Sequence, residues 1–395
     1  MGDSRKYCLT LFGATGFTGG LCADYLGRQL PDSANWAIAG RNREKLEAII
    51  AGLRREGVTN LPELIVAEAA DPRSLADMAS LTRVLISTVG PYVWHGEPLV
   101  QACVEHGTHY CDLTGEPEFV NNMISRYDEQ ARHRGAAIVN CCGFDSIPHD
   151  AGALFTWRQL QAACGNNLQG KVHMEGVVSA SGTFSGGTWQ SALTAFGRPG
   201  ENRSAMKRAG HVLDAVWPAT ARLLPMRPRH DRGFGGWICP MPTIDPFMVL
   251  RSARALAYAD DFRYGHYVLT DSLPRLIGGV AGVGGLLLAA QIRPVREKLL
   301  TFRESGQGPS AEKRARSWFK VHFRASANGK VVETEVSGAD PGYDETAKML
   351  AETAMALGLD ADLPRRTGVI TPVMALEDRL IERLTAADMT FRVLP

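Results

Sequence analysis

The chain has 395 residues, which is too many for one ordinary hydrophobic core, so we expect two or three domains. Its 43 basic and 42 acidic residues leave a net charge of +1, which gives no electrostatic case for a nucleic-acid partner. The eight cysteines include no C-x-x-C pair, so we predict no structural zinc site and no other bound metal. Several cysteines lie in apolar runs, as Cys141 and Cys142 do, which favours reduced thiols in a cytoplasmic protein.

The first third of the chain alternates short apolar runs with amphipathic segments. The apolar runs predict strands at residues 7–12, 36–39, 64–66, 83–89, 109–113 and 136–142. The segments between them predict helices at residues 18–29, 42–55, 72–80, 97–106 and 118–134. Strands that alternate with helices are typical of a parallel sheet, so we expect an α/β domain over residues 1–150. The first residues, MGDSRK, run directly into a strand, so no signal peptide is expected.

The alternation changes after residue 150. The later elements that we predict are a helix at 148–164, a strand at 172–181, a hairpin at 318–336 and a helix at 343–357. The hairpin has the strongest local signal, because Asn328 and Gly329 separate two alternating runs. We expect an α+β domain over residues 151–365 and a C-terminal segment, residues 366–395, that packs back on the first domain.

An uncharged run at residues 276–292 stands apart from the rest of the second domain. Arg275 and Arg293 flank it. It lies at the short end of what can span a bilayer, which takes about 20 apolar residues. Its five glycines make it a poor helix in water. Two interpretations stay open: a core element or oligomer contact, and an element on a membrane surface. We expect a homo-oligomer in the cytoplasm, with peripheral membrane contact as the second possibility.

The loop after the first predicted strand carries a dinucleotide-binding signature. It reads Gly13-Ala14-Thr15-Gly16-Phe17-Thr18-Gly19 and lies between a strand and a helix. Glycines there allow a tight turn and a close backbone approach to a pyrophosphate. The N-terminus of the following helix supplies free N–H groups and the positive end of a dipole. This placement indicates a Rossmann domain whose cofactor site includes residues 13–18.

The end of the second predicted strand indicates which cofactor binds. An acidic residue at that point would hold the ribose 2′-hydroxyl of NAD, but here the strand ends Ala39-Gly40-Arg41. An acid would repel a 2′-phosphate, whereas a guanidinium can grip one in a bidentate pair. We therefore predict NADP as the cofactor. The alternative is that Arg41 caps a loop or faces solvent.

Further cofactor contacts are expected after the third and fourth strands. Asp71 could accept a hydrogen bond from the adenine amino group, although a helix N-cap explains it equally well. Thr88, Gly90 and Pro91 follow the fourth strand, where small residues let the nicotinamide ribose lie against the backbone.

Five motifs together resemble the saccharopine dehydrogenase-like oxidoreductases. They are the loop at 13–19, Ala39-Gly40-Arg41, Thr88-Val89-Gly90-Pro91-Tyr92, Tyr110-Cys111-Asp112-Leu113-Thr114-Gly115-Glu116 and Gly143-Phe144-Asp145-Ser146-Ile147-Pro148. Within that family the chain resembles above all the trans-acting enoyl reductases and the animal saccharopine dehydrogenase-like proteins. The likeness is specific over residues 7–152. It implies NADPH between a Rossmann and an α+β domain, reduction of a lipid-like enoyl thioester, and a partner synthase that carries the acyl chain.

Enoyl reduction needs a hydride at the β carbon, a stabilised enolate oxygen and a proton for the α carbon. His95 is our first candidate for the proton donor, because it leaves the fourth strand toward the expected nicotinamide and can change charge near neutral pH. An ordinary surface histidine is the alternative. Tyr92, Tyr110 and His149 are further candidates for this role.

Carboxylates end the fifth and sixth strands. Asp112, Glu116 and Asp145 could orient the substrate or a neighbouring histidine. Asp112 could instead cap the turn at residues 114–115, and Asp145 could cap the helix that follows it. The loop TFSGGTW at residues 183–189 could form a nest of N–H groups for a carbonyl or phosphate, or be an ordinary loop.

Two other functions stay open. Saccharopine carries three carboxylates, so a site for that amino acid should gather several arginines or lysines. The eight basic residues between Arg198 and Arg232 could serve there, or could be solvated surface. A non-catalytic, NADP-binding scaffold at a membrane is the third interpretation, and binding without turnover would support it.

Overall fold

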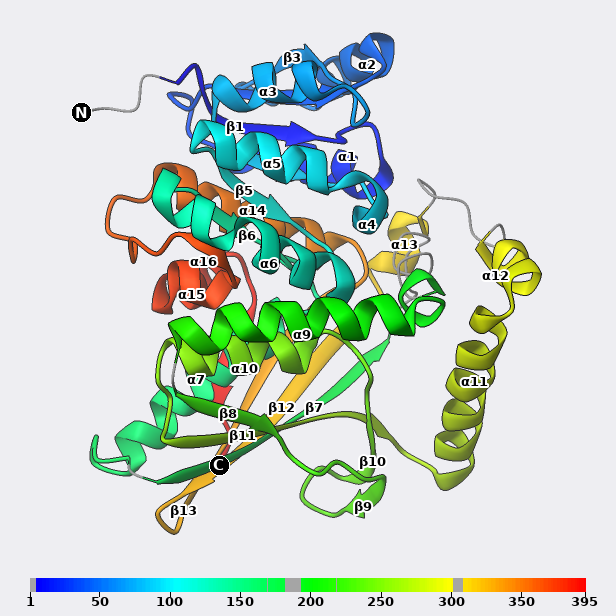
Figure 1. Ribbon diagram of the computed structural model, residues 1–395, viewed down its shortest axis with the longest axis vertical. Coiled ribbons are helices and arrows are strands. Elements are labelled where there is room, and N and C mark those ends of the chain that lie inside the picture. The colour runs from blue at the N-terminus through cyan, green and yellow to red at the C-terminus, as the bar shows by residue number, and fades with distance from the viewer. Residues whose placement is uncertain (1–4, 169, 182–192, 218, 301–307) are drawn as a thin grey trace.

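The computed structural model describes residues 5–168, 170–181, 193–217, 219–300 and 308–395. Figure 1 shows two β-sheets, one toward each end of the molecule, with helices between and around them. Strands and helices alternate through the first sheet, whereas the second sheet gathers strands from residue 171 to residue 393. The protein is therefore an α/β Rossmann domain joined to an α+β domain, as the sequence predicts.

The first sheet has seven strands in the order β14-β6-β5-β4-β1-β2-β3, and every neighbouring pair is parallel. Its strands are β1 (Tyr7–Phe12), β2 (Trp36–Gly40), β3 (Glu63–Val66), β4 (Thr82–Ser87), β5 (His109–Asp112), β6 (Ala137–Val139) and β14 (Gly368–Ile370). The six strands predicted in the first third are confirmed, β6 being shorter than expected. The order reverses between β1 and β4, and open α/β sheets bind ligands at the carboxyl ends beside such a switch point.

Helices cover both faces of this sheet (Figure 1). One layer holds α3 (Pro72–Ser80), α5 (Glu97–His106) and α6 (Pro117–Arg134), and the other holds α1 (Phe17–Gln29), α2 (Arg43–Arg55) and α14 (Asp344–Leu359). We expected α14 to belong to the second domain. Its packing against α1, β1, β4 and β5 corrects that boundary, because the helix buries its apolar side chains on the first sheet.

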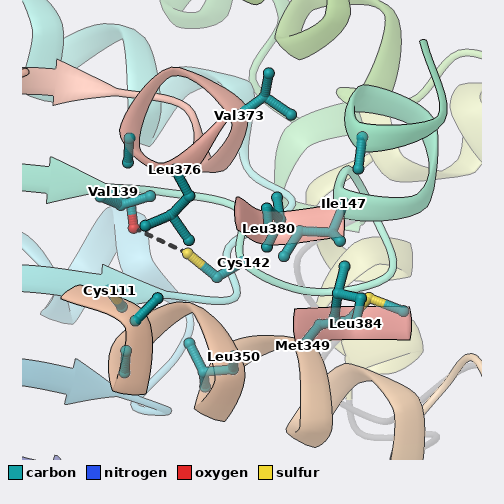
Figure 2. Close-up of a cluster of buried hydrophobic side chains, with 14 of the residues drawn as sticks. Cys111, Val139, Cys142, Ile147, Met349, Leu350, Val373, Leu376, Leu380 and Leu384 are labelled. Carbon is teal, nitrogen blue, oxygen red and sulfur yellow. Dashed lines mark hydrogen bonds between the residues drawn. The ribbon is translucent and has the colours of Figure 1, made fainter. Parts of the chain in front are cut away.

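The C-terminal residues complete the same core. Figure 2 shows Leu350 of α14 with Leu376 and Leu380 around Cys142, whose thiol donates to the Val139 carbonyl at 3.3 Å. These leucines belong to α15 (Pro372–Leu376) and α16 (Asp378–Ala386). All eight cysteines are free, so Cys142 is a buried thiol and not half of a disulfide. The C-terminal segment does not stay with one domain, since β14 pairs with β6 whereas β15 pairs with β13.

The second sheet has the order β15-β13-β12-β7-β11-β10-β9, with β8 paired to β11. Its strands are β7 (Lys171–Ser181), β8 (Thr220–Leu223), β9 (Arg229–Asp231), β10 (Gly236–Pro240), β11 (Asp261–Thr270), β12 (Trp318–Ala327), β13 (Lys330–Gly338) and β15 (Thr390–Val393). The predicted hairpin is confirmed: Ala327 faces Lys330, and the turn residues Asn328 and Gly329 have φ angles of 52° and 72°. Two such left-handed residues are what a tight hairpin turn requires.

Helices α7 and α10 connect the second sheet to the switch point. Helix α7 (Ile147–Ala163) begins directly after the loop that leaves β6 and packs on β12 and β13. Helix α10 (Asp245–Ala255) packs beside α7 and against β11. Helix α9 (Pro199–Val216) lies along α6 and joins the two halves on the near side of Figure 1. The first turn of α7 thus carries the chain from the carboxyl edge of the first sheet into the second domain.

The uncharged run lies in α11 (Leu273–Gln291), which stands beside the body of the molecule in Figure 1. Helix α12 (Arg293–Leu300) follows it. The run is helical as far as Gln291, although its glycines predicted a poor helix. Only Leu276 and Ala290 of α11 are buried, so the core interpretation of this run is wrong, whereas the oligomer contact and the membrane-surface element stay open. By length and composition alone, the helix is apolar enough to cross a membrane, with a mean hydropathy of 1.6, and little of it is buried.

Candidate functional site

The glycine loop is shaped by contacts that leave no room for side chains. Gly13 has a φ of +92°, and a Cβ there would lie 2.7 Å from both Thr88 Oγ1 and Val89 Cγ2. A Cβ on Gly19 would collide with the Gly13 carbonyl oxygen. Thr88 closes the loop from β4, because its hydroxyl donates to the Gly13 carbonyl at 3.1 Å. The loop is therefore held against both strands of the switch point.

Helix α1 begins without a side-chain cap. Gly16 is its N-cap residue, and the first turn contains no acidic side chain. The first N–H groups of an α-helix have no partner within the helix, so they remain available to a ligand. Thr15 and Gly16 are exposed, whereas Phe17 and Thr18 are half-buried. This turn fits the diphosphate of a dinucleotide.

Phe17 fastens the loop to later parts of the chain. Its ring meets Tyr343 edge-on at a centroid distance of 5.0 Å. The Arg314 guanidinium, in the short helix α13 (Ala311–Arg314), lies 5.4 Å from the same ring centroid. The side chain of this fingerprint residue therefore packs between structural elements, and its contribution to the ligand is its backbone.

Arg41 fits the predicted 2′-phosphate position. It is exposed directly after β2, and no ion pair joins it to any residue that the structure describes. Its neighbours are engaged: Asn42 caps α2 by accepting from Lys45 N at 2.9 Å, and Arg43 lies 3.8 Å from Glu47. Thr15 lies over Gly40, where a Cβ would be 3.9 Å from its side chain. Arg41 and Thr15 thus flank the end of β2.

Asp71 has the N-cap position that we gave as its alternative. Its carboxylate accepts from Arg73 N at 3.1 Å at the start of α3. That bond accounts for the residue without a cofactor, and an adenine contact remains a prediction. Gly90 and Pro91 follow β4 and lead into α4 (Tyr92–His95), beside the loop that Thr88 closes. Their contact with a nicotinamide ribose also remains a prediction.

The loops that follow β4, β5 and β6 form a unit that we name the rim. The carboxylates of Glu116 and Asp112 hold these loops together. Glu116 accepts from Tyr92 N at 3.0 Å and from Val93 N at 2.8 Å. Asp112 Oδ1 accepts from Thr114 N at 3.1 Å and from Cys141 N at 3.0 Å. Asp112 Oδ2 accepts from the Asn140 side-chain amide at 2.7 Å. The rim is a rigid frame, because its buried carboxylates are satisfied by backbone and amide donors.

Asp112 is fully buried in the rim, so it cannot contact a substrate directly. Burial raises its pKa to about 6, against the hydrogen bonds from Cys141, Thr114 and Asn140. Those bonds also hold Cys141 at a φ of 64°, a left-handed conformation that is uncommon outside glycine. The structure thus favours the turn-capping alternative for Asp112 over a role in orienting the substrate.

Three of the predicted proton donors, Tyr92, His95 and Tyr110, lie in different places. Tyr92 is buried, and its hydroxyl donates to the Ser87 carbonyl at 2.9 Å, which favours a structural role. His95 is exposed at the end of α4, where no described residue holds its imidazole. Tyr110 is fully buried in the sheet. The rim therefore brings none of these three side chains to its surface in a fixed orientation.

Asp145 is the carboxyl group that the rim presents. It follows β6, is half-buried, and lies over Gly115, where a Cβ would be 3.2 Å from Asp145 Oδ2. Burial and the negative charge of Asp245 together raise its pKa to about 7, against the opposing effect of His149. Near neutral pH this group is poised between acid and carboxylate, which is what a general acid requires.

A buried group of two imidazoles and one carboxylate, which we name the imidazole cluster, lies behind Asp145. His149 stands in the first turn of α7, Asp245 begins α10, and His266 lies in β11. His149 Nδ1 and Asp245 Oδ1 are 2.8 Å apart, and His266 Nε2 and Asp245 Oδ2 are 3.6 Å apart. The two imidazole rings meet edge-on with centroids 4.7 Å apart. His149 Nε2 is buried without a hydrogen-bond partner among the described residues.

The imidazole cluster holds a fixed negative charge near Asp145. Burial would raise the pKa of Asp245, but the two imidazoles, His149 above all, bring it below its usual range. Burial and the neighbouring His149 lower the pKa of His266 to about 3. Asp245 therefore stays ionised and His266 neutral at physiological pH. The charge of Asp245 disfavours ionisation of the nearby Asp145, so it keeps a proton there.

The same cluster bears on the prediction that no metal binds. One ligand atom from each of its three residues lies within 4.8 Å of the others, a spacing that could hold a metal ion. Each side chain is at most 1% exposed. Two of these ligand atoms, His149 Nδ1 and Asp245 Oδ1, already lie 2.8 Å apart as an ion pair. The arrangement is accounted for as a carboxylate between two imidazoles.

Sequence reasoning missed Asp245 and His266. Asp245 precedes Pro246 at a helix start, and His266 lies in an ordinary strand, so neither carries a local signal. His149 was a candidate only as one of several histidines near the strand ends. The three residues meet through tertiary packing of α7, α10 and β11. The loop at 183–189, which we considered as an N–H nest, lies outside the described residues.

Comparisons with known proteins agree with this geometry. A family model described as the saccharopine dehydrogenase NADP binding domain matches residues 9–139. A Mycobacterium tuberculosis protein with a provisional assignment as a trans-acting enoyl reductase is 34% identical, over 98% of this chain and 97% of that protein. The saccharopine dehydrogenase-like oxidoreductase of Mus musculus is 30% identical, over 99% of this chain and 98% of that protein.

A solved structure shares the overall fold. The apo saccharopine dehydrogenase (L-Glu forming) from Saccharomyces cerevisiae aligns over 98% of this chain and 99% of its own, with a TM-score of 0.56. Only 14% of the aligned residues are identical, so this likeness shows the fold alone.

Proposed function

Since the chain belongs to the saccharopine dehydrogenase-like oxidoreductases, which bind NADP, we propose that it reduces the carbon–carbon double bond of an enoyl thioester with NADPH. The observation that carries the proposal is Asp145, a half-buried carboxyl group at the carboxyl edge of the first sheet with a pKa raised to about 7. Such a group can give a proton to carbon at neutral pH.

The residues for NADPH come from the first sheet. The first turn of α1, from Gly16 to Thr18, would hold the diphosphate. Arg41 and Thr15 would hold the 2′-phosphate at the end of β2. Thr88 and the Gly90-Pro91 segment would lie beside the nicotinamide ribose. When bound, NADPH supplies the hydride that the β carbon of the acyl chain receives.

Asp145 completes the reaction on the other carbon. As the β carbon gains hydride, the α carbon of the resulting enolate needs a proton, which the Asp145 carboxyl group donates. The residue then becomes a carboxylate close to the charge of Asp245, which favours its reprotonation from solvent. The sum is one hydride and one proton added across the double bond. Asp145 is reached by solvent because it is only half-buried.

The surroundings of Asp145 support an uncharged acyl substrate over saccharopine. The charges that act on its pKa are those of Asp245 and His149, and no arginine or lysine of the described chain is among them. Of the basic residues considered for a tricarboxylate, Arg198 is bound to Glu118 at 2.8 Å and Arg229 to Glu175 at 2.7 Å. The other six, Arg203, Lys207, Arg208, Arg222, Arg227 and Arg232, are exposed. A trans-acting relative further supports delivery of the acyl chain by a partner synthase.

NADPH oxidation by purified protein tests the proposal. NADPH fluorescence is followed with a series of enoyl thioesters of increasing chain length, and saccharopine is offered with NADP in the reverse direction. We expect oxidation with the enoyl thioesters and, in D2O, one deuterium at the α carbon of the product. Turnover of saccharopine without any enoyl turnover would replace the proposal with an amino-acid dehydrogenase. Tight binding with no turnover of either would favour the scaffold.

A further inference from the structure

We propose that α11 and α12 form a surface that lies in the plane of an anionic membrane, with the helix axis parallel to the bilayer. This inference does not rest on the proposed reaction, since none of the residues that would hold NADPH belongs to α11 or α12. Figure 1 shows α11 beside the body, where most of its length has no neighbouring element in view.

Large apolar side chains form a stripe along α11. Leu273, Ile277, Val280 and Leu288 are 42%, 60%, 50% and 73% exposed. Their spacings of four, three and eight residues are close to whole helical turns, so the four side chains share one face. Soluble proteins seldom leave a continuous apolar face in water, and such faces mark contacts with membranes or partners.

The backbone of α11 also needs an apolar environment. Its five glycines have open space where a Cβ would stand, so no packing contact explains them. Each glycine in a helix interior costs about 1 kcal/mol relative to alanine in water. Acyl chains offer the backbone no hydrogen bonds, so they enforce the helix in spite of its glycines. The sequence and the exposure of α11 therefore fit a lipid environment better than water.

Both ends of α11 are fastened to the folded body. Two residues separate its first residue from β11. At the other end, the Gln291 side chain donates to the Phe196 carbonyl, and Arg296 donates to the Gly197 carbonyl at 3.2 Å. A spanning helix would carry its ends to opposite sides of a core that is about 30 Å thick. Because the same body holds both ends, α11 is confined to the plane of the membrane.

The positive charge of α12, next to the apolar stripe, favours a membrane that contains anionic lipids. The sequence of α12 is RPVREKLL, with three basic residues and one acidic residue. Val295 of α12 is 39% exposed, so this basic helix also presents an apolar side chain to its surroundings. Basic residues next to an inserted apolar face bind membranes that contain anionic lipids.

Flotation with vesicles tests the membrane surface on the full chain. Wild-type protein and an Ile277→Glu, Val280→Glu, Leu288→Glu variant are mixed with vesicles of phosphatidylcholine alone or with 30% phosphatidylserine, roughly the anionic content of a cytoplasmic leaflet. We expect the wild type to float with the anionic vesicles and the variant to lose at least tenfold in bound fraction. Val331→Glu is the control, because Val331 is also exposed, at 61%, but lies on β13 and not on α11 or α12.

Two further measurements keep the test decisive. NADPH binding must be equal in the variant and the wild type, which shows that the variant folds. Equal flotation of both proteins would overturn the proposal, as would no flotation together with a dimer that the variant dissociates. In Ile277→Trp and Leu288→Trp variants, brominated lipids should quench the added fluorescence at the same depth. If the depths of the two tryptophans differed by about 16 Å, which is a rise of about 1.5 Å for each residue between them, the helix would span the membrane.

Discussion

The rim and the imidazole cluster use buried carboxylates in opposite ways. In the rim, Asp112 and Glu116 accept from four backbone N–H groups and one amide, so their charges hold three loops in place. In the cluster, Asp245 faces two imidazoles, and its charge acts on groups that can gain or lose a proton. The rim carboxylates therefore fix the positions of loops, whereas the Asp245 carboxylate shifts the pKa of nearby groups. Asp145 belongs to the loops of the rim, and its pKa responds to the charge of Asp245.

The largest expected effect comes from Asp145, which joins the two regions. Asp145→Asn removes the proton donor but keeps the shape, so kcat with an enoyl thioester should fall by about 100- to 10,000-fold, the usual contribution of a general acid. NADPH affinity, measured by fluorescence titration, should stay within about twofold. His95→Ala is the comparison, because the proposal assigns the proton to Asp145 and therefore predicts full turnover in this variant. A large loss in His95→Ala with an active Asp145→Asn would return the role to His95.

Removing Asp112 should break the frame. Asp112→Ala leaves the N–H groups of Thr114 and Cys141 and the Asn140 amide without their buried acceptor, which should cost roughly 3 kcal/mol in the free energy of unfolding. Urea denaturation measures the change. Asp71→Ala provides the contrast, because the loss of one exposed N-cap should cost only about 1 kcal/mol. Equal losses in both variants would contradict the rim as a rigid frame.

Arg41 is an exposed cation that lies outside both the rim and the imidazole cluster. Arg41→Ala should weaken NADPH binding by about 10- to 100-fold, the value of a charge-assisted hydrogen bond to phosphate, and should leave NADH binding unchanged. Fluorescence titration with both cofactors measures the difference. Equal losses for NADPH and NADH would assign Arg41 to the fold instead of the 2′-phosphate. Arg43→Ala is a suitable control, since Arg43 lies near Glu47 on α2.

The smallest effect should come from within the imidazole cluster. The charge of Asp245 raises the pKa of Asp145, so Asp245→Asn should lower it. Because the protonated form of Asp145 is active, kcat falls as pH rises through that pKa. The variant should therefore lose activity at a lower pH than the wild type. An unchanged pH profile of kcat in a folded Asp245→Asn protein would separate the cluster from the reaction.

The first sheet could be predicted because its signals are local. Strand and helix periodicity, the glycine loop and the Asp71 N-cap each lie within a few neighbouring residues. The Asn328-Gly329 turn is equally local and was predicted correctly. Periodicity tells which residues of α14 are buried, but not which sheet they are buried against, so its domain was misplaced. The same limit hid Asp245 and His266, which reach His149 only after α10 and β11 have packed.

The interleaving of the last strands has a consequence for synthesis on the ribosome. Helix α14 ends at Leu359, β14 pairs with β6 only at Gly368–Ile370, and β15 reaches β13 only at Thr390–Val393. Until these residues emerge, the apolar side chains in Figure 2 lack the cover of α14, α15 and α16. The nascent chain thus exposes core residues of the first sheet until translation is nearly complete, and a fragment that stops at residue 150 would expose them permanently.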